Sequence, residues 1–192
     1  MKRKIKTNRI KLSVSYREQC VCCGSILEEK LRFDNFPVFS GARTKEQSDF
    51  YADLTWAECV NCKMLQLGTI VPEKYVYKYT HNPGTVGQTW KNHHNEFARF
   101  LMNHGNGTVL EIGGGHGRLS EICIAEGFHD WLMFEPNPGN MINPAVKIRK
   151  EFFSEKTKPS EKFDLLVHSH FFEHLLDPKA FLKIAHEVLN ED

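Results

Sequence analysis

The sequence contains no apolar run that approaches the roughly 20 residues needed to cross a bilayer, which argues against a membrane-spanning helix. The N-terminus is basic but lacks the apolar stretch of a secretory signal. A formal net charge of +1 produces no large field of either sign, so nucleic acid is a disfavoured partner. Internal repeats and low-complexity segments are also missing. These absences indicate a globular protein, which we expect in the cytoplasm.

The chain is long enough for one ordinary domain, or for a small metal-stapled module followed by part of a larger domain. Changes in composition predict four segments. They are a basic tail over residues 1–16, a cysteine-bearing module over 17–70, a connector with a helix over 71–105, and an α/β domain over 106–192. The basic cluster of the tail is expected to be solvated, and an arm for an anionic partner is the alternative.

Two pairs of cysteines with the spacing of a metal site lie in the second segment. They are Cys20 with Cys23 and Cys59 with Cys62. Two intervening residues let each pair wrap one side of a tetrahedral zinc ion with thiolate ligands. The glycine after Cys23, Gly24, can adopt the positive φ of such a turn. The sequence therefore predicts a zinc site with four cysteine ligands.

The remaining cysteine near the first pair, Cys22, would leave a one-residue gap and a poor chelate turn, so we expect it not to bind the metal. Six cysteines without a secretory signal favour a reducing compartment, where such pairs bind metal. Buried free thiols or a redox pair are the alternatives. Because the module contains few apolar residues, we expect the metal to stabilise its fold. Four sulfur ligands would leave no coordination position for a substrate, so the metal is not expected to be catalytic.

From residue 108 onward, short apolar strands alternate with helices. Strands are predicted at 109–112, 131–134, 146–148 and 163–167, and helices at 116–126 and 178–189. A preceding helix over 85–104 carries Trp90, Phe97 and Leu101 on one face. The alternation is typical of a parallel, doubly wound, Rossmann-like sheet.

A glycine-rich turn follows the first of these strands. It contains Glu111, Gly113, Gly114, Gly115 and Gly117. The glycines let the backbone turn sharply and let a ligand approach closely. Glu111 lies within the first strand and suits a cofactor with a cationic end. Glu135, which Pro136 follows, ends the second strand, where a carboxylate can accept hydrogen bonds from ribose hydroxyls. A dinucleotide site or an ordinary structural turn are the alternatives.

The segment after the last strand should line the ligand cleft, since ligands of open α/β sheets bind beyond the carboxyl ends of the strands. Within it, Glu173 and His174 are adjacent and could transfer protons, because imidazole titrates near neutrality and a carboxylate can orient it. The alternative is that both hold the turn or fix the cofactor's amino-acid end. His168 and His170 are expected in the wall of the cleft.

The glycine-rich turn resembles the first motif of class I S-adenosylmethionine-dependent methyltransferases, and the full series resembles the zinc-containing sugar C-methyltransferases. The matches are Cys20, Cys23, Gly24, Cys59, Cys62, Gln66, Leu67, Tyr77, Tyr79, Thr89, His93, the 111–117 turn, Glu135, Glu173 and His174. The resemblance implies methyl transfer to carbon 3 of a nucleotide-linked 4-keto-deoxysugar. It also implies that a base, here His174 with Glu173, removes the acidic C–H proton, and that His170 and Tyr77 join the turn, Glu135 and Pro136 in binding the cofactor.

Two departures from the family accompany this resemblance. Phe171 stands where similar members carry a tyrosine, so a hydroxyl donor to the enolate is missing or is supplied elsewhere. The helix predicted at 178–190 ends with the chain, so we expect about four of the seven strands of a class I sheet. An incomplete domain would expose a sheet edge and the apolar face of that helix, namely Phe181, Ile184 and Val188, and would favour self-association.

An incomplete domain is expected to bind cofactor but to be weakly active or inactive alone. The functional alternatives are an RNA or protein methyltransferase that grips its substrate with the zinc module, and a non-catalytic cofactor-binding module.

Overall fold

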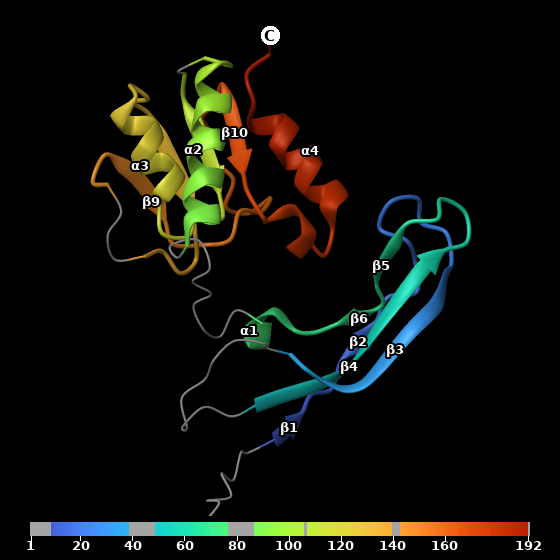
Figure 1. The fold of residues 1–192 in the computed structure, drawn as a ribbon. Coiled ribbons are helices and arrows are strands. Elements are labelled where there is room, and N and C mark those ends of the chain that lie inside the picture. The colour runs from blue at the N-terminus through green and yellow to red at the C-terminus, as the bar shows by residue number, and fades with distance from the viewer. Residues whose placement is uncertain (1–8, 39–48, 77–86, 106, 140–142, 192) are drawn as a thin grey trace, which may run out of the picture. The chain divides into compact units, whose positions relative to one another are not determined.

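The computed structural model divides into two compact units, Met1–Thr80 and His81–Asp192. The residues that it describes are 9–38, 49–76, 87–105, 107–139 and 143–191. Figure 1 shows the long strands of the first unit and the layered helices and strands of the second. The boundary between the units falls inside the predicted connector, residues 71–105, so the helix of that segment belongs to the second unit.

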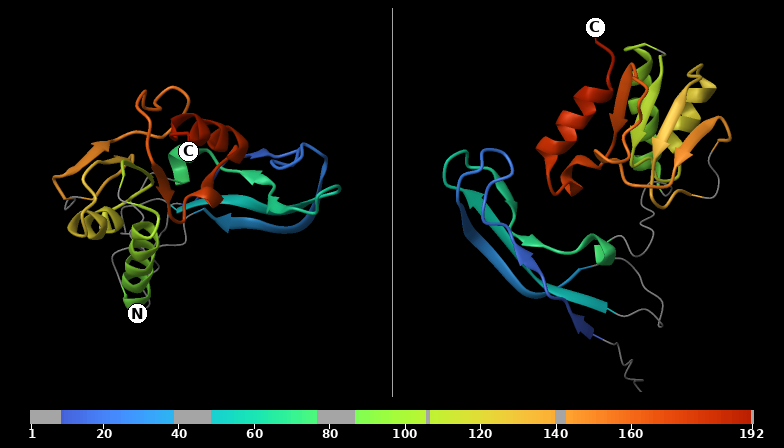
Figure 2. Two further views of the ribbon diagram at one scale, coloured as in Figure 1. Left: turned by 90° about the horizontal axis from the view of Figure 1, so that it is seen from above. Right: turned by 180° about the vertical axis from the view of Figure 1, so that it is seen from behind.

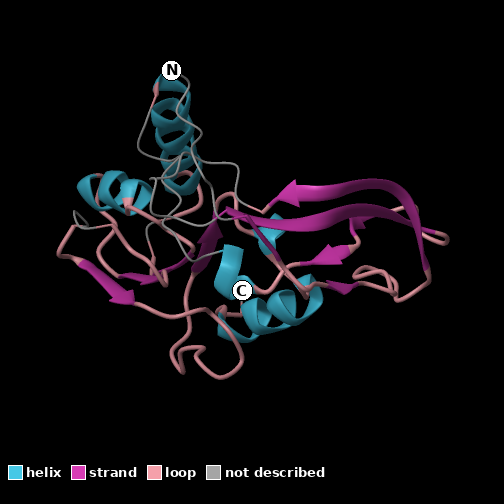
Figure 3. Cartoon of the chain, turned by 90° about the horizontal axis from the view of Figure 1, so that it is seen from below, coloured by secondary structure: helices cyan, strands magenta, loops and turns pink. Residues whose placement is uncertain are grey.

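The first unit is built on two long antiparallel strands. β3 (Leu27–Pro37) pairs with β4 (Asp49–Cys59), and β4 also pairs with β1 (Arg9–Lys11) and β5 (Leu65–Leu67). A separate antiparallel pair is formed by β2 (Ser15–Tyr16) and β6 (Thr69–Ile70), and a short helix, α1 (Glu73–Val76), follows. The two long strands are the magenta arrows that run side by side in Figure 3.

β4 carries five of the buried side chains of this unit, and their alternation changes phase between Ala52 and Thr55. Phe50, Ala52, Thr55, Ala57 and Cys59 are all buried, and the residues between them are more exposed. The hydroxyl groups of Thr55 and Thr69 lie 3.1 Å apart, which satisfies both polar groups inside the module. The last buried residue of β4 is Cys59, so the buried side chains of the strand lead directly to the predicted metal site.

Residues 9–16 differ from the prediction of a basic tail, because they contain β1 and β2. β1 runs parallel to the start of β4. Its basic side chains are held by that strand: the Arg9 guanidinium lies 5.3 Å from the centre of the Tyr51 ring, and Lys11 Nζ lies 3.0 Å from the Asp53 carboxylate. β3 and β4 are each 11 residues long.

The second unit contains a four-stranded parallel sheet in the order β10-β7-β8-β9. The strands are β7 (Val109–Ile112), β8 (Trp131–Phe134), β9 (Val146–Arg149) and β10 (Leu165–His168). Helices α2 (Gln88–Met102) and α3 (Arg118–Ala125) cover one face, and α4 (Pro178–Val188) covers the other. The views in Figure 2 show α3 and α4 on opposite sides of the sheet. The predicted α/β class with a parallel sheet is confirmed.

The predicted exposure of the apolar face of α4 is wrong. Phe181 and Val188 are only 5% and 2% exposed. They pack with Leu110, Leu132 and other side chains that project from the sheet on this side. Asp177 caps the helix: its carboxylate accepts a hydrogen bond of 3.0 Å from the backbone N–H of Ala180, which stabilises the first turn.

Candidate metal centre and cofactor crevice

The four predicted ligands come together at one end of the first unit. The Sγ atoms of Cys20, Cys23, Cys59 and Cys62 all lie within 4.8 Å of one another. The sulfurs of Cys20 and Cys62 are 3.6 Å apart, and those of Cys23 and Cys59 are 3.4 Å apart. A tetrahedral zinc ion with Zn–S bonds of about 2.3 Å places its sulfurs about 3.8 Å from one another. The cluster therefore has the dimensions of a zinc site.

Two turns present these sulfurs. In the first, the N–H of Gly24 donates to the Cys20 carbonyl (2.9 Å), with Gly24 at a φ of 75°. In the second, the N–H of Lys63 donates to the Cys59 carbonyl (3.1 Å), with Lys63 at a φ of 63°. Backbone N–H groups also point at the sulfurs: that of Cys22 lies 3.4 Å from Cys20 Sγ. Cys22 thus supports the site through its backbone, and its thiol is outside the cluster.

Gln66 on β5 supports the first turn, a role that the sequence did not predict. Its side chain is buried, its amide nitrogen donates to Cys20 Sγ (3.3 Å), and its amide oxygen accepts from the N–H of Val21 (3.2 Å). One side chain thereby satisfies both the sulfur and the backbone of the turn. The only sequence signal for it was its place among the motifs of the resemblance.

The thiols do not ionise equally without a cation. Burial would raise the pKa of Cys20, but hydrogen bonds from the Cys23 backbone and Gln66 outweigh it and the pKa is lowered. Hydrogen bonds from Ser25 and then from Cys59 lower the pKa of Cys23 to about 5. The Met64 N–H favours the Cys62 thiolate, but burial and the neighbouring sulfurs raise its pKa to about 12. A divalent cation would remove this mutual repulsion, so the donor set fits Zn²⁺.

The glycine-rich turn leaves β7 through three left-handed residues. Gly113, Gly115 and Gly117 have φ values of 74°, 56° and 68°. Such values are strained for any residue with a Cβ, which explains glycine at these positions. Gly115 differs from its neighbours because a Cβ added there would meet no atom within 4 Å. The backbone at Gly115 therefore faces open space, as a turn that receives a ligand requires.

Glu135 joins this turn to the end of β8. One carboxylate oxygen accepts from the N–H of Gly115 (3.0 Å) and the other from the N–H of Asn137 (2.9 Å). The N–H of Gly139 in turn donates to the Gly115 carbonyl (3.0 Å). Each carboxylate oxygen keeps a lone pair that a ribose hydroxyl can use. Pro136, also predicted to contact the cofactor, continues this loop directly after Glu135.

Glu111 occupies a different environment from the one that the sequence indicated. The residue is 4% exposed, and its carboxylate accepts a hydrogen bond of 2.8 Å from the indole N–H of Trp131. A Cβ on Gly114 would lie 2.7 Å from the Glu111 carboxyl carbon, so the carboxyl group lies directly under the turn. Burial raises the pKa of Glu111 to about 7, despite the hydrogen bond from Trp131. The carboxyl group of Glu111 therefore points into the core, where Trp131 is its described hydrogen-bond donor.

The residues after β10 lie next to the glycine turn. Because His168 pairs in register with Ile112, Ser169 follows at the level of Gly113. The ring of Phe171 covers Gly113: a Cβ there would be 3.2 Å from the Phe171 ring. His168 stacks on the Phe172 ring with the centroids 6.0 Å apart, and burial lowers its pKa.

The predicted proton-transfer pair lies in a short 3-10 turn, η1 (Phe172–His174). Glu173 and His174 are both exposed, and the Glu173 carboxylate lies 3.7 Å from Nδ1 of His170. His170 is therefore a described neighbour of Glu173. Tyr77, predicted to contact the cofactor, lies outside the described residues.

A contact that the sequence did not predict connects α2 to this segment. His93 Nε2 lies 2.8 Å from Ser169 Oγ. The ring of Trp90, one turn earlier on α2, meets the ring of His170 edge to face with the centroids 4.8 Å apart. The sequence signal for His93 was its place among the motifs of the resemblance, and Trp90 was predicted on the apolar face of this helix.

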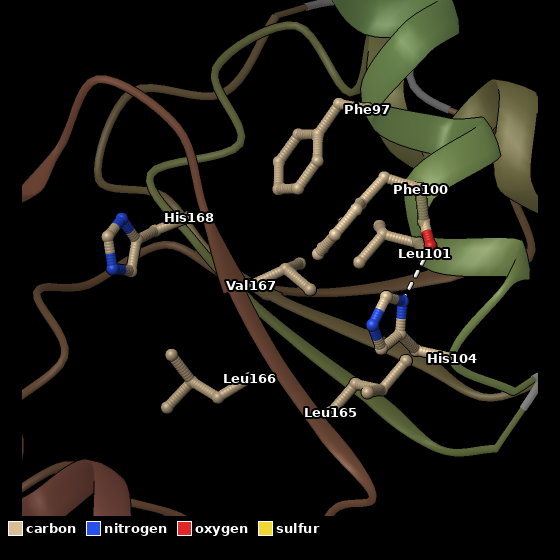
Figure 4. A pocket seen from close by; sticks show the side chains of 8 residues that line it. All are labelled: Phe97, Phe100, Leu101, His104, Leu165, Leu166, Val167 and His168. Atoms are coloured by element: carbon tan, nitrogen blue, oxygen red, sulfur yellow. Dashed lines mark hydrogen bonds between the residues drawn. The ribbon is translucent and has the colours of Figure 1, made fainter.

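A shallow apolar hollow of about 230 Å³ lies farther along α2, beside β10. Its lining is Phe97, Phe100, Leu101, His104, Leu165, Leu166, Val167 and His168. In Figure 4 the two phenylalanine rings and Leu101 point from α2 toward β10, and the ring nitrogen of His104 is bonded to its own helix at Phe100. No carboxylate or ammonium group lines the hollow, and its polar side chains are those of His104 and His168.

The comparisons bear on the second unit. The family model described as a methyltransferase domain matches residues 88–192. A comparison with curated proteins gave no match.

Among the described helices, none combines the length and the apolar character that a membrane crossing requires. The matched residues run from the first residue of α2 to the last of the chain and include the glycine turn, Glu135 and the segment after β10. Because the match covers more than half of its residues, the chain belongs to the methyltransferase-domain family.

Proposed function

We propose that this protein transfers a methyl group from S-adenosylmethionine to a carbon atom of a nucleotide-linked keto-deoxysugar. The observation that carries the cofactor assignment is the open left-handed turn at Gly115, held to the acidic end of β8 by Glu135. Membership in the methyltransferase-domain family supports the same cofactor, which is typical of such domains.

The order of the strands supports the location of the crevice. The chain adds β8 and β9 on one side of β7 and then crosses to place β10 on the other side. Ligands of open α/β sheets bind at such a switch point, beyond the carboxyl ends of the strands. The glycine turn after β7 and Ser169 after β10 both lie there. Glu135, one strand away, is proposed to accept hydrogen bonds from the ribose hydroxyls.

The chemistry of the transfer follows from the residues after β10. The bound cofactor supplies an electrophilic methyl group on a sulfonium. His174 would accept the proton from the acceptor C–H beside a keto group, and the electron pair of that bond would become available to the methyl group that the cofactor supplies. Glu173 is proposed to orient the imidazole for this proton transfer. The keto-deoxysugar is proposed on the resemblance of the motif series.

The four cysteines are proposed to hold a structural zinc ion. All four tetrahedral positions are taken by sulfur, so the metal has no position for water or substrate. Its role is to hold the ends of β4 and β5 in place in a unit with few large buried side chains.

The test of cofactor binding is isothermal calorimetry with S-adenosylhomocysteine. Gly115→Val should abolish binding, since a branched side chain is strained at this φ and fills the open side of the turn. Gly127→Val is the matched control, because Gly127 is also left-handed with open space around it but follows α3 at the other end of the helix. Equal affinity of wild type and Gly115→Val would refute the placement, and a preference for NAD would indicate an oxidoreductase.

The acceptor is tested separately, by transfer of radioactive methyl groups to a nucleoside-diphosphate 4-keto-6-deoxyhexose, an RNA mixture and a peptide mixture. Transfer to the sugar nucleotide alone supports the proposal. Transfer to either polymer in its place contradicts the sugar assignment while leaving the cofactor assignment intact.

An RNA methyltransferase is the second candidate, and one observation favours it. The first unit presents cations over aromatic rings, Arg9 over Tyr51 and Arg32 over Tyr16, with centroid distances of 5.3 and 5.7 Å. Such pairs can stack on bases. Tyr16→Ala removes one of these rings from an exposed position. RNA binding by the whole chain that Tyr16→Ala weakens would favour an RNA substrate over a sugar substrate.

A further inference from the structure

The amino-acid end of the proposed cofactor needs polar partners, for which the sequence offered Glu111 and, as an alternative, Glu173 with His174. This end carries a carboxylate and an ammonium group. Glu111 was expected to meet it, but its carboxyl group is buried under Gly114 and bonded to Trp131. Other groups at the switch point must therefore bind the charged end.

His93 and Ser169 form a polar pair at this point. Ser169 follows β10 beside Gly113, and His93 approaches it from the N-terminal half of α2, with 2.8 Å between Nε2 and Oγ. Both residues are partly buried. A hydroxyl group can accept one hydrogen bond and donate another. When His93 donates from Nε2, the Ser169 hydroxyl hydrogen is available for an anion in the crevice.

The surroundings hold this pair in place. His170 has a φ of 51°, a value that is strained for a residue with a Cβ. Its ring packs against Trp90 and lies 5.3 Å from the His93 ring, centroid to centroid. Strained backbone of this kind persists where the surrounding structure over-determines it, and such residues cluster at ligand sites. The strain lies one residue from Ser169.

The electrostatic environment of His93 also suits an anion. Burial, followed by repulsion from His94 and His170, lowers the pKa of His93, so the imidazole is neutral at pH 7 in the free protein. His94 lies on the same helix, and His170 and Glu173 face the cluster from the segment after β10. An anion bound at the pair would favour the protonated imidazole and raise its pKa.

We infer that Ser169 binds the carboxylate of the cofactor's amino-acid end and that His93 is the positioning residue that orients the Ser169 hydroxyl. The inference rests on the proposed function, since it assumes S-adenosylmethionine in the crevice. It assigns the recognition of this end to the contact between α2 and β10.

The experiment compares two ligands by calorimetry on the full chain. S-adenosylhomocysteine has the amino-acid end, whereas 5′-methylthioadenosine keeps the adenosine and the thioether but lacks that end. Ser169→Ala should weaken S-adenosylhomocysteine about tenfold to a hundredfold, as expected for one hydrogen bond to a charged group, and should leave 5′-methylthioadenosine unchanged. His93→Ala should do the same, and His93→Gln, which keeps an N–H donor, should retain most of the affinity.

Two matched controls lie outside the crevice. They are Ser160→Ala, an exposed serine bonded to Glu161, and His104→Ala, an exposed histidine bonded to Phe100 after the opposite end of α2. Wild-type affinity for S-adenosylhomocysteine should also rise as the pH falls from 8 to 6, because binding raises the pKa of His93. His93→Ala should lack this dependence.

Each outcome decides the question. Unchanged S-adenosylhomocysteine affinity in both Ser169→Ala and His93→Ala overturns the inference but leaves the proposed function standing. Equal loss of both ligands overturns it as well, because the pair then shapes the whole crevice. The same pH dependence in His93→Ala overturns the role of His93. A wild-type protein that binds neither ligand overturns the inference together with the proposed function.

Discussion

Replacing Glu111 by glutamine should change how the stability of the second unit depends on pH. The carboxyl group is fully enclosed, with the Trp131 indole as its described hydrogen-bond donor. Glutamine has nearly the same shape and keeps an oxygen that can accept this bond. Like the protonated carboxyl group, it is neutral and offers both a donor and an acceptor.

The magnitude follows from the pKa of Glu111, which burial raises from its ordinary value of 4.5 to about 7. Below pH 4.5 the group is protonated in the folded and the unfolded states and costs nothing. Between these values the unfolded state ionises first, so the free energy of unfolding falls as the pH rises, and above about pH 7 the loss is constant. At about 1.4 kcal/mol per pH unit, the total loss is about 3 kcal/mol.

Urea unfolding at pH 5 and at pH 8, read by hydrogen exchange of peptides from β7 and β8, isolates the second unit. Between these pH values the wild type should lose about 2 to 3 kcal/mol more than Glu111→Gln. Glu121→Gln, which changes an exposed glutamate on α3, should behave as the wild type does. A parallel pH dependence in wild type and Glu111→Gln would refute the buried, neutral carboxyl group.

The metal site gives two further predictions. Cys59→Ser should abolish stoichiometric zinc, measured by mass spectrometry of the purified protein, and should unfold the first unit, whereas Cys22→Ser should retain the metal because its thiol lies outside the cluster. Gln66→Ala should weaken zinc about tenfold to a hundredfold in a chelator competition, since it removes a donor to Cys20 Sγ. Full zinc retention in Cys59→Ser would contradict the four-cysteine assignment, and unchanged affinity in Gln66→Ala would contradict its supporting role.

Features that depend on neighbouring residues could be predicted from the sequence. Three of the four strands of the second unit, β7, β8 and β10, occupy mainly apolar runs, whereas β9 alternates apolar and basic residues. α4 shows its buried face in its spacing. The cysteine pairs follow the same logic, because two residues between ligands fix the local geometry of each turn. The fold class of the second unit and the four-cysteine cluster could therefore be predicted from the sequence.

Features that depend on distant residues could not be predicted. β1 is ordered by pairing with β4, about forty residues later, and nothing in a basic segment indicates that partner. Glu111 is buried because Trp131 lies on the adjacent strand in register with Val109, two residues away. His93 and Ser169 are separated by 76 residues and meet only after β10 has crossed the sheet. Long-range contacts of this kind carry no local pattern.

The alternating burial of β4 has a consequence for how the first unit reaches a single pairing. β4 is the common partner of β1, β3 and β5, and its last buried residue is Cys59. Slippage by one residue would turn every side chain of β4 to the opposite face, and Cys59 with them. With an ion on the four cysteines, every slipped alignment forfeits a metal ligand. Metal binding would then select a single strand register for the whole sheet. Burial alone selects the register poorly in this module, because β3 is exposed along nearly its whole length.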